Sequence, residues 1–244
     1  MLRNVSYSAI RFLAALLLSS ALSASEGAPL EEATGIAGGI SIPDVPGKPF
    51  SATAVLEIER YWSDGSTQVR RTINLVARDS EGRTHNEVRR LMPEYFHGSP
   101  QLLSVHLFDP LTRIRTDLDP GIHVAHQQLI PKNPKTDVTP NPALRTEDLG
   151  TATMNGLEVK GTRRTTTISA KASGIGDPVE VEDEFWYSDE LHLNLLVRHS
   201  DPRVGVDTVG LSNLKREEPP AGMFHIPAGY QVLDVTPSSE RTDR

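Results

Sequence analysis

From residue 50 onward, apolar and polar residues alternate in short segments that are separated by turn sequences. Residues 54–62 show the pattern, with Leu56, Ile58 and Trp62 on one side and glutamates between them. A period of two is typical of a strand with one buried face. Because the segments are rich in Val, Ile, Thr and aromatic residues, they indicate an antiparallel β protein. The sequence therefore predicts a mainly β fold: a large curved antiparallel sheet or half-barrel with few short helices.

The expected strands fall into two groups. Asn155-Gly156 between two of them predicts a tight hairpin. Residues 127–147 contain four prolines and few apolar groups, so we expect a long surface loop that separates the groups. The expected strands are 54–62, 68–78, 83–91, 102–108, 113–117, 122–126, 149–154, 157–168, 179–187, 191–199 and 206–214.

The second strand, residues 68–78, has a clear alternation that predicts which face is buried. Its apolar side is expected to face the core and its polar side to face solvent. The apolar side is Val69, Ile73, Leu75 and Ala77, and the polar side is Arg70, Thr72, Asn74 and Arg78. Helical spacing is not sustained anywhere, so we expect only short helices, near residues 189–191 or within 217–223.

The N-terminus has the order of features that defines a secretory signal. Arg3 and Arg11 precede the apolar run 12–18, and small residues follow. That run is too short for a membrane span, which needs about 20 apolar residues. The sequence therefore predicts a signal peptide over residues 1–25 and export to the periplasm or the outside of the cell; a retained N-terminal anchor is the alternative.

Composition divides the remaining chain into three parts. Residues 26–47 are rich in Gly, Pro and small side chains, which predicts a flexible leader. A single β-rich domain is expected over residues 48–235, with ordered structure beginning at Phe50. Residues 236–244 are expected to form a disordered tail.

Cysteine content and charge exclude several classes of protein. The chain has no cysteine, which excludes disulfides, a thiol nucleophile and acylation on cysteine. Without the Arg3 and Arg11 of the signal, 23 basic and 32 acidic residues remain, a net charge of −9. A net-negative chain has no general attraction for phosphate backbones, so no nucleic-acid partner is expected. Neither a cofactor nor a transmembrane span in the mature chain is expected.

The stretch 161–178, with two arginines, a threonine run and two nearby glycines, has two interpretations. A phosphate-binding loop needs a lysine after the glycines and a following helix, and both are missing from the sequence. The stretch instead predicts a strand and a hairpin loop. In the expected pairing Arg164 lies opposite Glu184 and Thr166 opposite Glu182, which gives only weak cross-strand pairs.

Candidate chemistry is sparse, so neither a metal site nor a catalytic site is expected. The eight histidines lack ligand spacing, since His123 and His126 would point to opposite faces of a strand. The acidic run 180–184 lacks calcium-loop spacing and predicts a solvated sheet face, with Val181, Phe185 and Tyr187 toward the core. Serine catalysis has no G-x-S-x-G motif, and Ser80, Ser104 and Ser200 stand in ordinary turn or strand contexts.

Several short motifs are recognisable as a set: Pro49-Phe50-Ser51-Ala52, 77–83, 147–150, 161–168, Trp186-Tyr187-Ser188 and 199–203. Taken together, they resemble a family of uncharacterised secreted proteins common in Acidobacteria. A second motif lies near the C-terminus: Phe224-His225-Ile226-Pro227-Ala228-Gly229-Tyr230. It is similar to the C-terminal end of periplasmic proteins with the lipoprotein-carrier fold. That second resemblance implies a curved antiparallel sheet around an apolar groove.

Three functions are compatible with the sequence. The first is a non-enzymatic periplasmic or secreted binding module for a lipid, another apolar ligand or a protein partner. The second is an envelope structural or interaction protein without a small ligand. The third is a hydrolase whose site is assembled only in three dimensions. A continuous open groove lined by Leu56, Ile58, Ile73, Leu75 and Val181 would favour the first.

Overall fold

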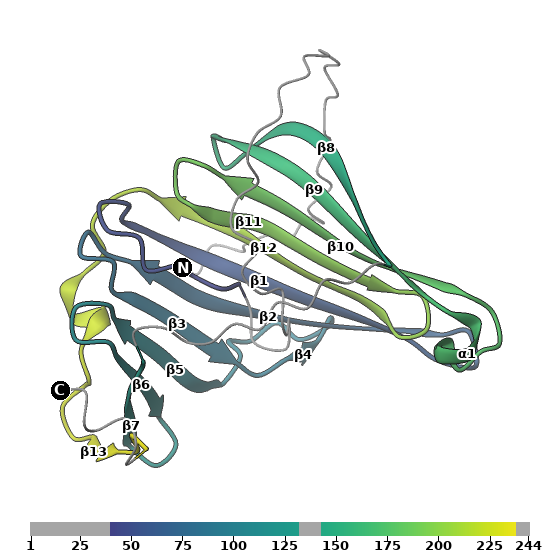
Figure 1. The fold of residues 1–244 in the computed structure, drawn as a ribbon. Helices are drawn as coiled ribbons and strands as arrows, with labels where there is room; N and C mark the ends of the chain where they lie inside the picture. The colour runs from purple at the N-terminus through teal and green to yellow at the C-terminus, as the bar shows by residue number, and fades with distance from the viewer. Residues whose placement is uncertain (1–39, 132–142, 238–244) are drawn as a thin grey trace. The chain divides into compact units, whose positions relative to one another are not determined.

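The computed structural model describes residues 40–131 and 143–237, which form one sheet of 13 strands. The sheet order is β13-β7-β6-β5-β3-β2-β1-β12-β11-β10-β9-β8, and β4 pairs with β2 off this path. Figure 1 shows the sheet twisting and curving from β8 to β7. The predicted mainly β fold with a large curved sheet is confirmed. The strands are β1 (Phe50–Tyr61), β2 (Thr67–Arg78), β3 (Thr84–Arg89), β4 (Met92–Pro93), β5 (Leu102–Asp109), β6 (Ile114–Asp119), β7 (Val124–Leu129), β8 (Leu144–Met154), β9 (Leu157–Ile168), β10 (Val179–Ser188), β11 (Leu193–Asp201), β12 (Gly205–Lys215) and β13 (Gln231–Asp234).

Two antiparallel groups of strands meet where β1 pairs with β12. The first group runs from β1 to β7 and the second from β8 to β12. The predicted hairpin at Asn155-Gly156 joins β8 to β9, and both turn residues have positive φ, as a type I′ turn requires. The final strand, β13, pairs in parallel with β7, a pairing that the sequence analysis did not predict.

The loop predicted over residues 127–147 is too long at both ends. Residues 127–129 belong to β7 and residues 144–147 belong to β8, because each extends a ladder with its neighbour. Residues 132–142 lie outside the described residues. Few apolar side chains mark these strand ends, so their pairing comes from backbone hydrogen bonds that carry no sequence signature.

Helices are short, as expected, but only one of them overlaps an expected position. A single turn, α1 (Ala170–Ser173), closes the β9–β10 hairpin, and the 3-10 turn η2 (Ala221–Phe224) overlaps the end of the expected 217–223 segment. The 189–191 corner is a turn without a helix. None of the helices in the described residues has the length and hydropathy needed to span a membrane.

In the middle of β2 the buried face is the reverse of the predicted one, although Ala77 is buried as predicted. Thr72 and Asn74 are buried, whereas Ile73 and Leu75 are each 38% exposed. The register explains the reversal, because Thr72 lies opposite Leu56 and Asn74 opposite the core residue Ala54. Facing residues on paired strands share a face of the sheet, so β1 fixes the orientation of β2 regardless of its own pattern.

The last residues of the expected leader are attached to the sheet. Ile40 is buried in the core and Ile42 packs against it. Arg78, with 0% exposure, donates hydrogen bonds to the carbonyls of Pro43, Lys48 and Leu191. Ordered structure therefore begins before Phe50. The expected signal peptide and residues 26–39 lie outside the described residues.

The buried apolar residues form two separate clusters. The main cluster packs strands of both groups and consists of Ile40, Phe50, Ala52, Ala54, Leu56, Val76, Leu157, Val159, Leu191, Leu193, Leu195, Val209 and Leu211. The second cluster is small: Val105, Leu107, Leu118 and Ala125, on β5 to β7. The C-terminal segment covers it through Ile226 and Tyr230. This second cluster positions the candidate site.

Candidate ligand pocket

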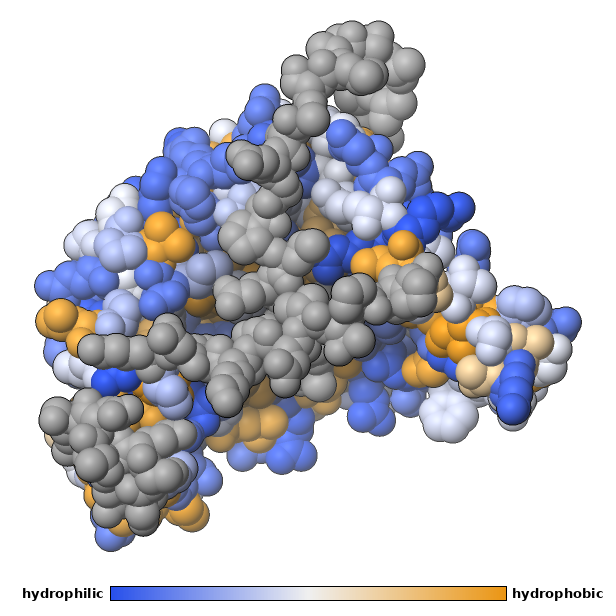
Figure 2. Space-filling view, in the orientation of Figure 1, coloured by the Kyte–Doolittle hydropathy of each residue, from blue (hydrophilic) through white to orange (hydrophobic). Residues whose placement is uncertain are grey.

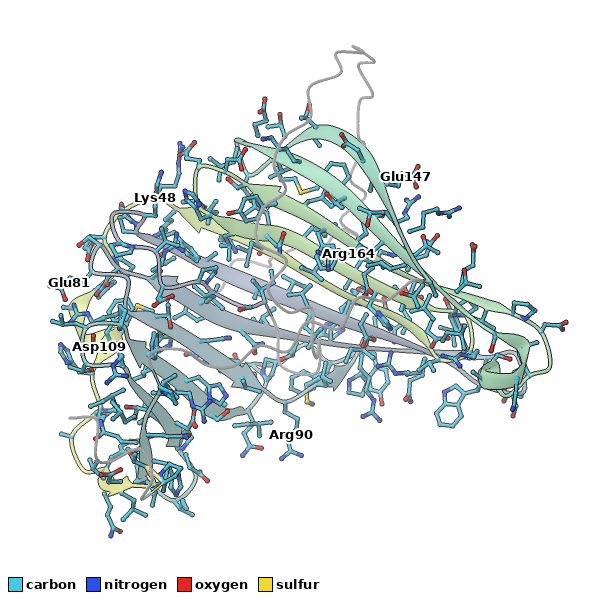
Figure 3. All side chains as sticks on the ribbon, in the orientation of Figure 1. Lys48, Glu81, Arg90, Asp109, Glu147 and Arg164 are labelled. Atoms are coloured by element: carbon cyan, nitrogen blue, oxygen red, sulfur yellow. The ribbon has the colours of Figure 1, made fainter. Side chains whose placement is uncertain are left out.

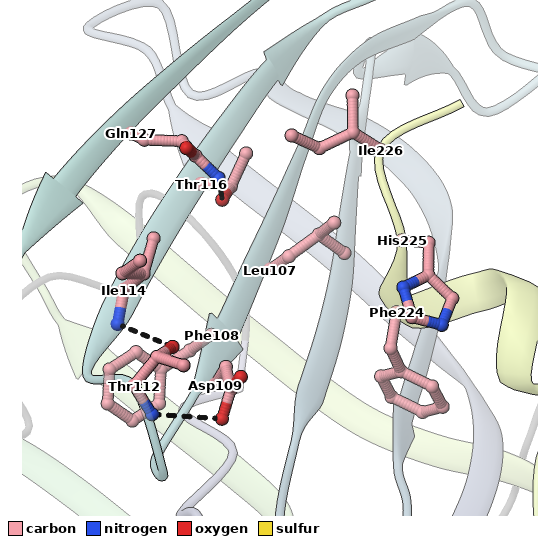
Figure 4. Close-up of a pocket in the computed structure, with 10 residues that line it drawn as sticks. All are labelled: Leu107, Phe108, Asp109, Thr112, Ile114, Thr116, Gln127, Phe224, His225 and Ile226. Atoms are coloured by element: carbon pink, nitrogen blue, oxygen red, sulfur yellow. Dashed lines mark hydrogen bonds between the residues drawn. The ribbon is translucent and has the colours of Figure 1, made fainter. Parts of the chain in front are cut away.

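A pocket of about 390 Å³ lies beside the second cluster, between the sheet and the C-terminal segment. Leu107 on β5 lies directly opposite Thr116 on β6, which lies opposite Gln127 on β7. Facing residues of paired strands point the same way, so these three side chains form the floor. Phe224, His225 and Ile226 form the opposite wall (Figure 4). Phe108, Asp109, Thr112 and Ile114 complete the lining.

The lining combines apolar side chains with polar groups. Gln127 Nε2 donates to Thr116 Oγ1 at 3.2 Å, which holds the carboxamide along the floor. At the turn, Asp109 Oδ1 accepts from the backbone N–H group of Leu111 at 2.9 Å. It also accepts from the N–H group of Thr112 at 3.3 Å (Figure 4). The volume falls within the range of about 300–1,000 Å³ that is typical of small-molecule sites, and the lining offers both apolar contacts and hydrogen-bonding groups.

The wall formed by the C-terminal segment is held at several points. His85 Nδ1 lies 2.7 Å from the carbonyl oxygen of Met223, and because a carbonyl only accepts, Nδ1 carries the proton. The Arg83 guanidinium lies 5.5 Å from the centre of the Phe224 ring. Further along, the Thr236 hydroxyl accepts from the Leu129 N–H at 3.0 Å. The C-terminal segment is therefore attached to both β3 and β7.

A buried acid on β3 lies next to this attachment. Burial alone would raise the pKa of Glu87, but the neighbouring His85 and Arg89 side chains and the Leu75 N–H outweigh it and lower the pKa to about 2. Arg89 Nε donates to Glu87 Oε2 at 2.8 Å. Glu87 is consequently ionised at neutral pH and holds β2 and β3 together where the pocket wall is attached.

The predicted groove residues do not form one groove. Leu56 belongs to the main cluster, and Ile58 packs against it. Ile73 and Leu75 lie on the opposite face, since Val55, not Leu56, is the partner of Ile73. Val181 is buried on β10. The pocket residues were missed because Gln127 fell in an expected loop and residues 224–226 carried only a family resemblance.

On the face that carries Ile73, an apolar row crosses the sheet from β2 to β10. The register places its members directly opposite one another: Ile73, Val55, Gly210, Leu196 and Trp186. The Trp186 ring lies over Gly161 of β9, where a Cβ would come within 2.8 Å of it. Glycine is needed there because the neighbouring ring occupies the side-chain space.

A row of alternating charge runs beside the apolar row. Its members are Arg71, Glu57, Thr208, Arg198, Glu184, Arg163 and Glu147. Arg163 pairs with Glu184 at 3.3 Å and with Glu147 at 3.5 Å, and Glu184 accepts from Trp186 Nε1 at 2.6 Å. The charges neutralise one another, which leaves the apolar row as the main feature of this face.

The remaining candidate residues take structural roles. Residues 161–178 form a strand and hairpin loop, but the pairing is one residue from the expected one: Glu184 lies opposite Arg163, and Asp183 opposite Arg164. Figure 3 shows Arg164 and Glu147 on neighbouring strands. The Arg164 guanidinium lies 5.0 Å from the centre of the Phe185 ring. In the described ranges no group of three His, Cys, Asp or Glu side chains is arranged for a metal.

Exposed apolar side chains also gather at the end of the sheet that carries α1. Figure 2 shows apolar residues grouped there, among polar ones. Trp62, Ile175 and Val204 are exposed members of the turns at this end. They border no described cavity, so the pocket over β5 to β7 stays the best-defined site.

No family model matches the chain, and no curated protein matches it. Solved structures give only distant likenesses. An uncharacterized conserved protein from Thermus thermophilus is 12% identical, with a TM-score of 0.39, over 77% of this chain and 91% of the other. A chain of the Pseudomonas aeruginosa MucA/MucB complex is 14% identical, with a TM-score of 0.40, and this chain spans 77% of its own length and 59% of that one.

A third likeness is to the Mycobacterium tuberculosis lipoprotein LppX, at 11% identity and a TM-score of 0.28, over 69% of this chain and 88% of the other. At these scores the likenesses assign neither a family nor a function. The resemblance to the Acidobacteria family stays a prediction.

Proposed function

We propose that this protein is an exported binding module that takes a small apolar ligand in the pocket over β5 to β7. The pocket itself is the observation that carries the proposal: about 390 Å³, open to solvent and lined by five apolar and five polar side chains. The second cluster beside it is too small to fill the space under the C-terminal segment. A ligand that buries hydrocarbon against Leu107, Ile114 and Ile226 gains roughly 25 cal/mol for each Å² of apolar surface removed from water.

The polar groups narrow the class of ligand. Asp109 brings a carboxylate to the rim and the Arg83 guanidinium lies near enough to interact with it, so the opposite charges balance and favour a ligand without net charge. Thr112 and the Gln127 carboxamide offer neutral donors and acceptors. We therefore expect a neutral ligand with one apolar body and one hydroxyl, ester or amide group. We expect this binding to take place in the periplasm or outside the cell, because the sequence predicts a signal peptide.

An apolar fluorescent dye tests the pocket directly. In the Ile114→Trp variant the indole fills the cavity, and dye affinity is expected to fall about tenfold or more, the equivalent of a lost group worth about 1.4 kcal/mol. Leu111→Trp is the matched control, because Leu111 lies in the adjoining turn and is 90% exposed. Equal dye binding by both variants and the wild type would contradict the pocket as the ligand site.

Native mass spectrometry of protein purified from a periplasmic extract identifies a natural ligand. A co-purified neutral lipid-like molecule that is lost in Ile114→Trp but kept in Leu111→Trp is the expected result. A ligand that both variants retain would place binding elsewhere.

A protein partner is the second candidate function, and the apolar row favours it. Exposed Ile73 and the partly exposed Val55 and Leu196 form a strip that a partner would cover, and Trp186 at its end also packs against the main cluster. If the wild type binds no dye and carries no ligand, an envelope interaction role becomes the better explanation. In that case Ile73→Glu is expected to remove cross-linking to the partner, while Ile114→Trp is not.

A further inference from the structure

A chain of hydrogen bonds joins a serine, a histidine and an aspartate on β5 and β6. Ser104 Oγ lies 3.2 Å from His106 Nε2, and His106 Nδ1 lies 2.6 Å from Asp117 Oδ1. Ser104 lies on a strand, as expected, and the sequence did not predict these hydrogen bonds. No sequence motif contains these three residues, because only strand pairing brings Asp117 close to the other two.

Strand geometry explains the arrangement. Ser104 and His106 are two apart on β5 and therefore share a face, and Asp117 lies directly opposite His106 on β6. The pocket floor begins at Leu107, one residue further on, so it uses the other face. Leu103 is an extra residue where β5 pairs with β3, since Val88 faces Ser104 while Arg89 faces Leu102. A bulge of this kind re-aims neighbouring side chains and is common next to active sites.

The direction of each hydrogen bond follows from the charges. The hydrogen bond from His106 lowers the pKa of Asp117 and, with the nearby positive charge of Arg115, outweighs the opposing effect of burial. Arg115 Nε lies 3.4 Å from Asp117 Oδ2. An ionised carboxylate can only accept, so Nδ1 of His106 donates to it. In the neutral imidazole Nε2 then keeps its lone pair and accepts from the Ser104 hydroxyl, the order that a general base requires.

A side-chain amide without a hydrogen-bond partner among the described residues lies beside these three hydrogen-bonded side chains. Asn86 on β3 is directly opposite His106 and diagonal to Ser104, within the reach of cross-strand side chains. Its carboxamide makes no hydrogen bond among the described residues. An amide N–H next to an attacked carbonyl stabilises the negative charge that forms on its oxygen. Val88, opposite Ser104, offers a small apolar contact for an acyl group.

A second His–Asp pair in the same sheet shows which features distinguish the site on β5 and β6. His199 Nδ1 lies 2.7 Å from Asp183 Oδ1 on paired strands, much as His106 does from Asp117. No serine hydroxyl is bound to its other nitrogen within the described ranges. The His–Asp pair alone is thus a recurring structural contact, and the bound serine with an amide beside it is what sets the β5–β6 site apart.

We propose that Ser104, His106 and Asp117 form an acyl-transfer site that hydrolyses small acyl esters. Ser104 Oγ attacks the acyl carbon while its proton passes to His106 Nε2. The ester C–O bond breaks, and His106 returns the proton to the departing alkoxide, which leaves as an alcohol. Water then attacks the acyl-serine with His106 again as base, and the carboxylic acid leaves with Ser104 restored.

The exposure of the site limits its substrates. The His106 side chain is 44% exposed, and neither described cavity includes any of the three residues. A long acyl chain would find no enclosing walls, so we expect short acyl groups such as acetyl, carried on small or surface-exposed alcohols. The site lies on the other face of β5 from the ligand pocket, so it neither needs nor excludes the proposed binding function. A positive result would overturn the expectation of a non-enzymatic chain.

A fluorophosphonate probe and p-nitrophenyl acetate test the proposal on the full-length exported protein. Peptide mass spectrometry is expected to find the probe on Ser104, and Ser104→Ala to lose both the label and ester hydrolysis. Removing the base in His106→Gln is expected to slow labelling about 100-fold or more, and Asp117→Asn to slow it in the same direction. His199→Gln is the matched control and is expected to leave labelling unchanged.

Two outcomes would overturn the proposal. One is a wild-type protein that takes up no probe at Ser104. The other is labelling that His106→Gln and His199→Gln affect equally, which would show a merely exposed hydroxyl. Ile114→Trp separates this site from the pocket, because it is expected to lose dye binding and keep Ser104 labelling. All variants should retain the wild-type circular dichroism, since each replaced side chain is partly exposed.

Discussion

The two hydrophobic clusters of the sheet differ in how each is closed. The main cluster combines residues from both strand groups and from Ile40, so several elements pack against it. The second cluster has only four buried residues, and a single irregular segment covers it through Ile226 and Tyr230. The cavity adjoins the second cluster. Dense packing needs side chains from several directions, and a region with one irregular cover keeps space that a ligand can fill.

The largest expected effect separates the clusters by stability. Phe50 is fully buried in the main cluster, and Phe50→Ala is expected to lower the free energy of unfolding by about 3–5 kcal/mol. Leu107 borders the pocket, so Leu107→Ala is expected to cost about 2–3 kcal/mol, at the low end for such truncations. Urea unfolding measures both.

Dye binding sharpens the same comparison. Leu107→Ala enlarges the pocket and is expected to change dye affinity, whereas Phe50→Ala is expected to leave it unchanged under conditions where the variant is folded. Equal losses of stability together with equal dye binding would show that the two clusters do not differ as described.

Acid is expected to weaken the attachment between β2, β3 and the pocket wall. The pKa of Glu87 in the folded protein is about 2, below the ordinary value of 4.5. A lowered folded pKa stabilises the protein above the unfolded pKa, and this contribution disappears as pH falls from about 4.5 to about 2. With Glu87 largely buried, the loss is on the order of 3 kcal/mol.

Urea unfolding at a series of pH values from 6 to 2 measures this dependence. Glu87→Gln is expected to be less stable at pH 6 and to lose less on acidification than the wild type. Glu94→Gln is the control, because the Glu94 side chain is 58% exposed. The same acid dependence in wild type and Glu87→Gln would contradict the role of Glu87.

The smallest expected effect is a gain of stability in the main cluster region. Thr72 Oγ1 is buried and has no hydrogen-bond partner in the described part of the chain. Thr72→Val removes that unpaired hydroxyl at nearly constant volume, so we expect a gain of about 1 kcal/mol in the free energy of unfolding. Thr53→Val, at a partly exposed position of β1, is expected to change it little. A destabilised Thr72→Val would indicate that the hydroxyl is satisfied after all.

β1 and β2 show what the alternation of apolar and polar residues can predict and what it cannot. In β1 the alternation and the observed burial agree, since Ala54 and Leu56 are buried. In β2 the more apolar side is the more exposed one, because pairing with β1 turns Thr72 and Asn74 inward. A local pattern predicts that a segment is a strand, but the partner strand decides which of its faces is buried.

The candidate sites could not be predicted from the sequence, for the same reason. Gln127 and Thr116 meet Leu107 only through two strand pairings, and Asp117 meets His106 only through one of them. The motif 224–230 drew attention to the C-terminal segment but not to the strands that it covers. No spacing along the chain encodes such contacts, because each joins residues from separate strands.

The sequence by itself determined the class of fold, most of the strands, the Asn155-Gly156 hairpin and the absence of disulfides, since these depend on local alternation, turn chemistry and composition. It also carries the predictions of export and of a net-negative mature chain. Only the tertiary structure decided the buried face of β2, the parallel pairing of β13, the pocket under residues 224–226 and the Ser104–His106–Asp117 chain. These depend on register and on which segments cover the sheet, and register is a property of paired strands rather than of either strand alone.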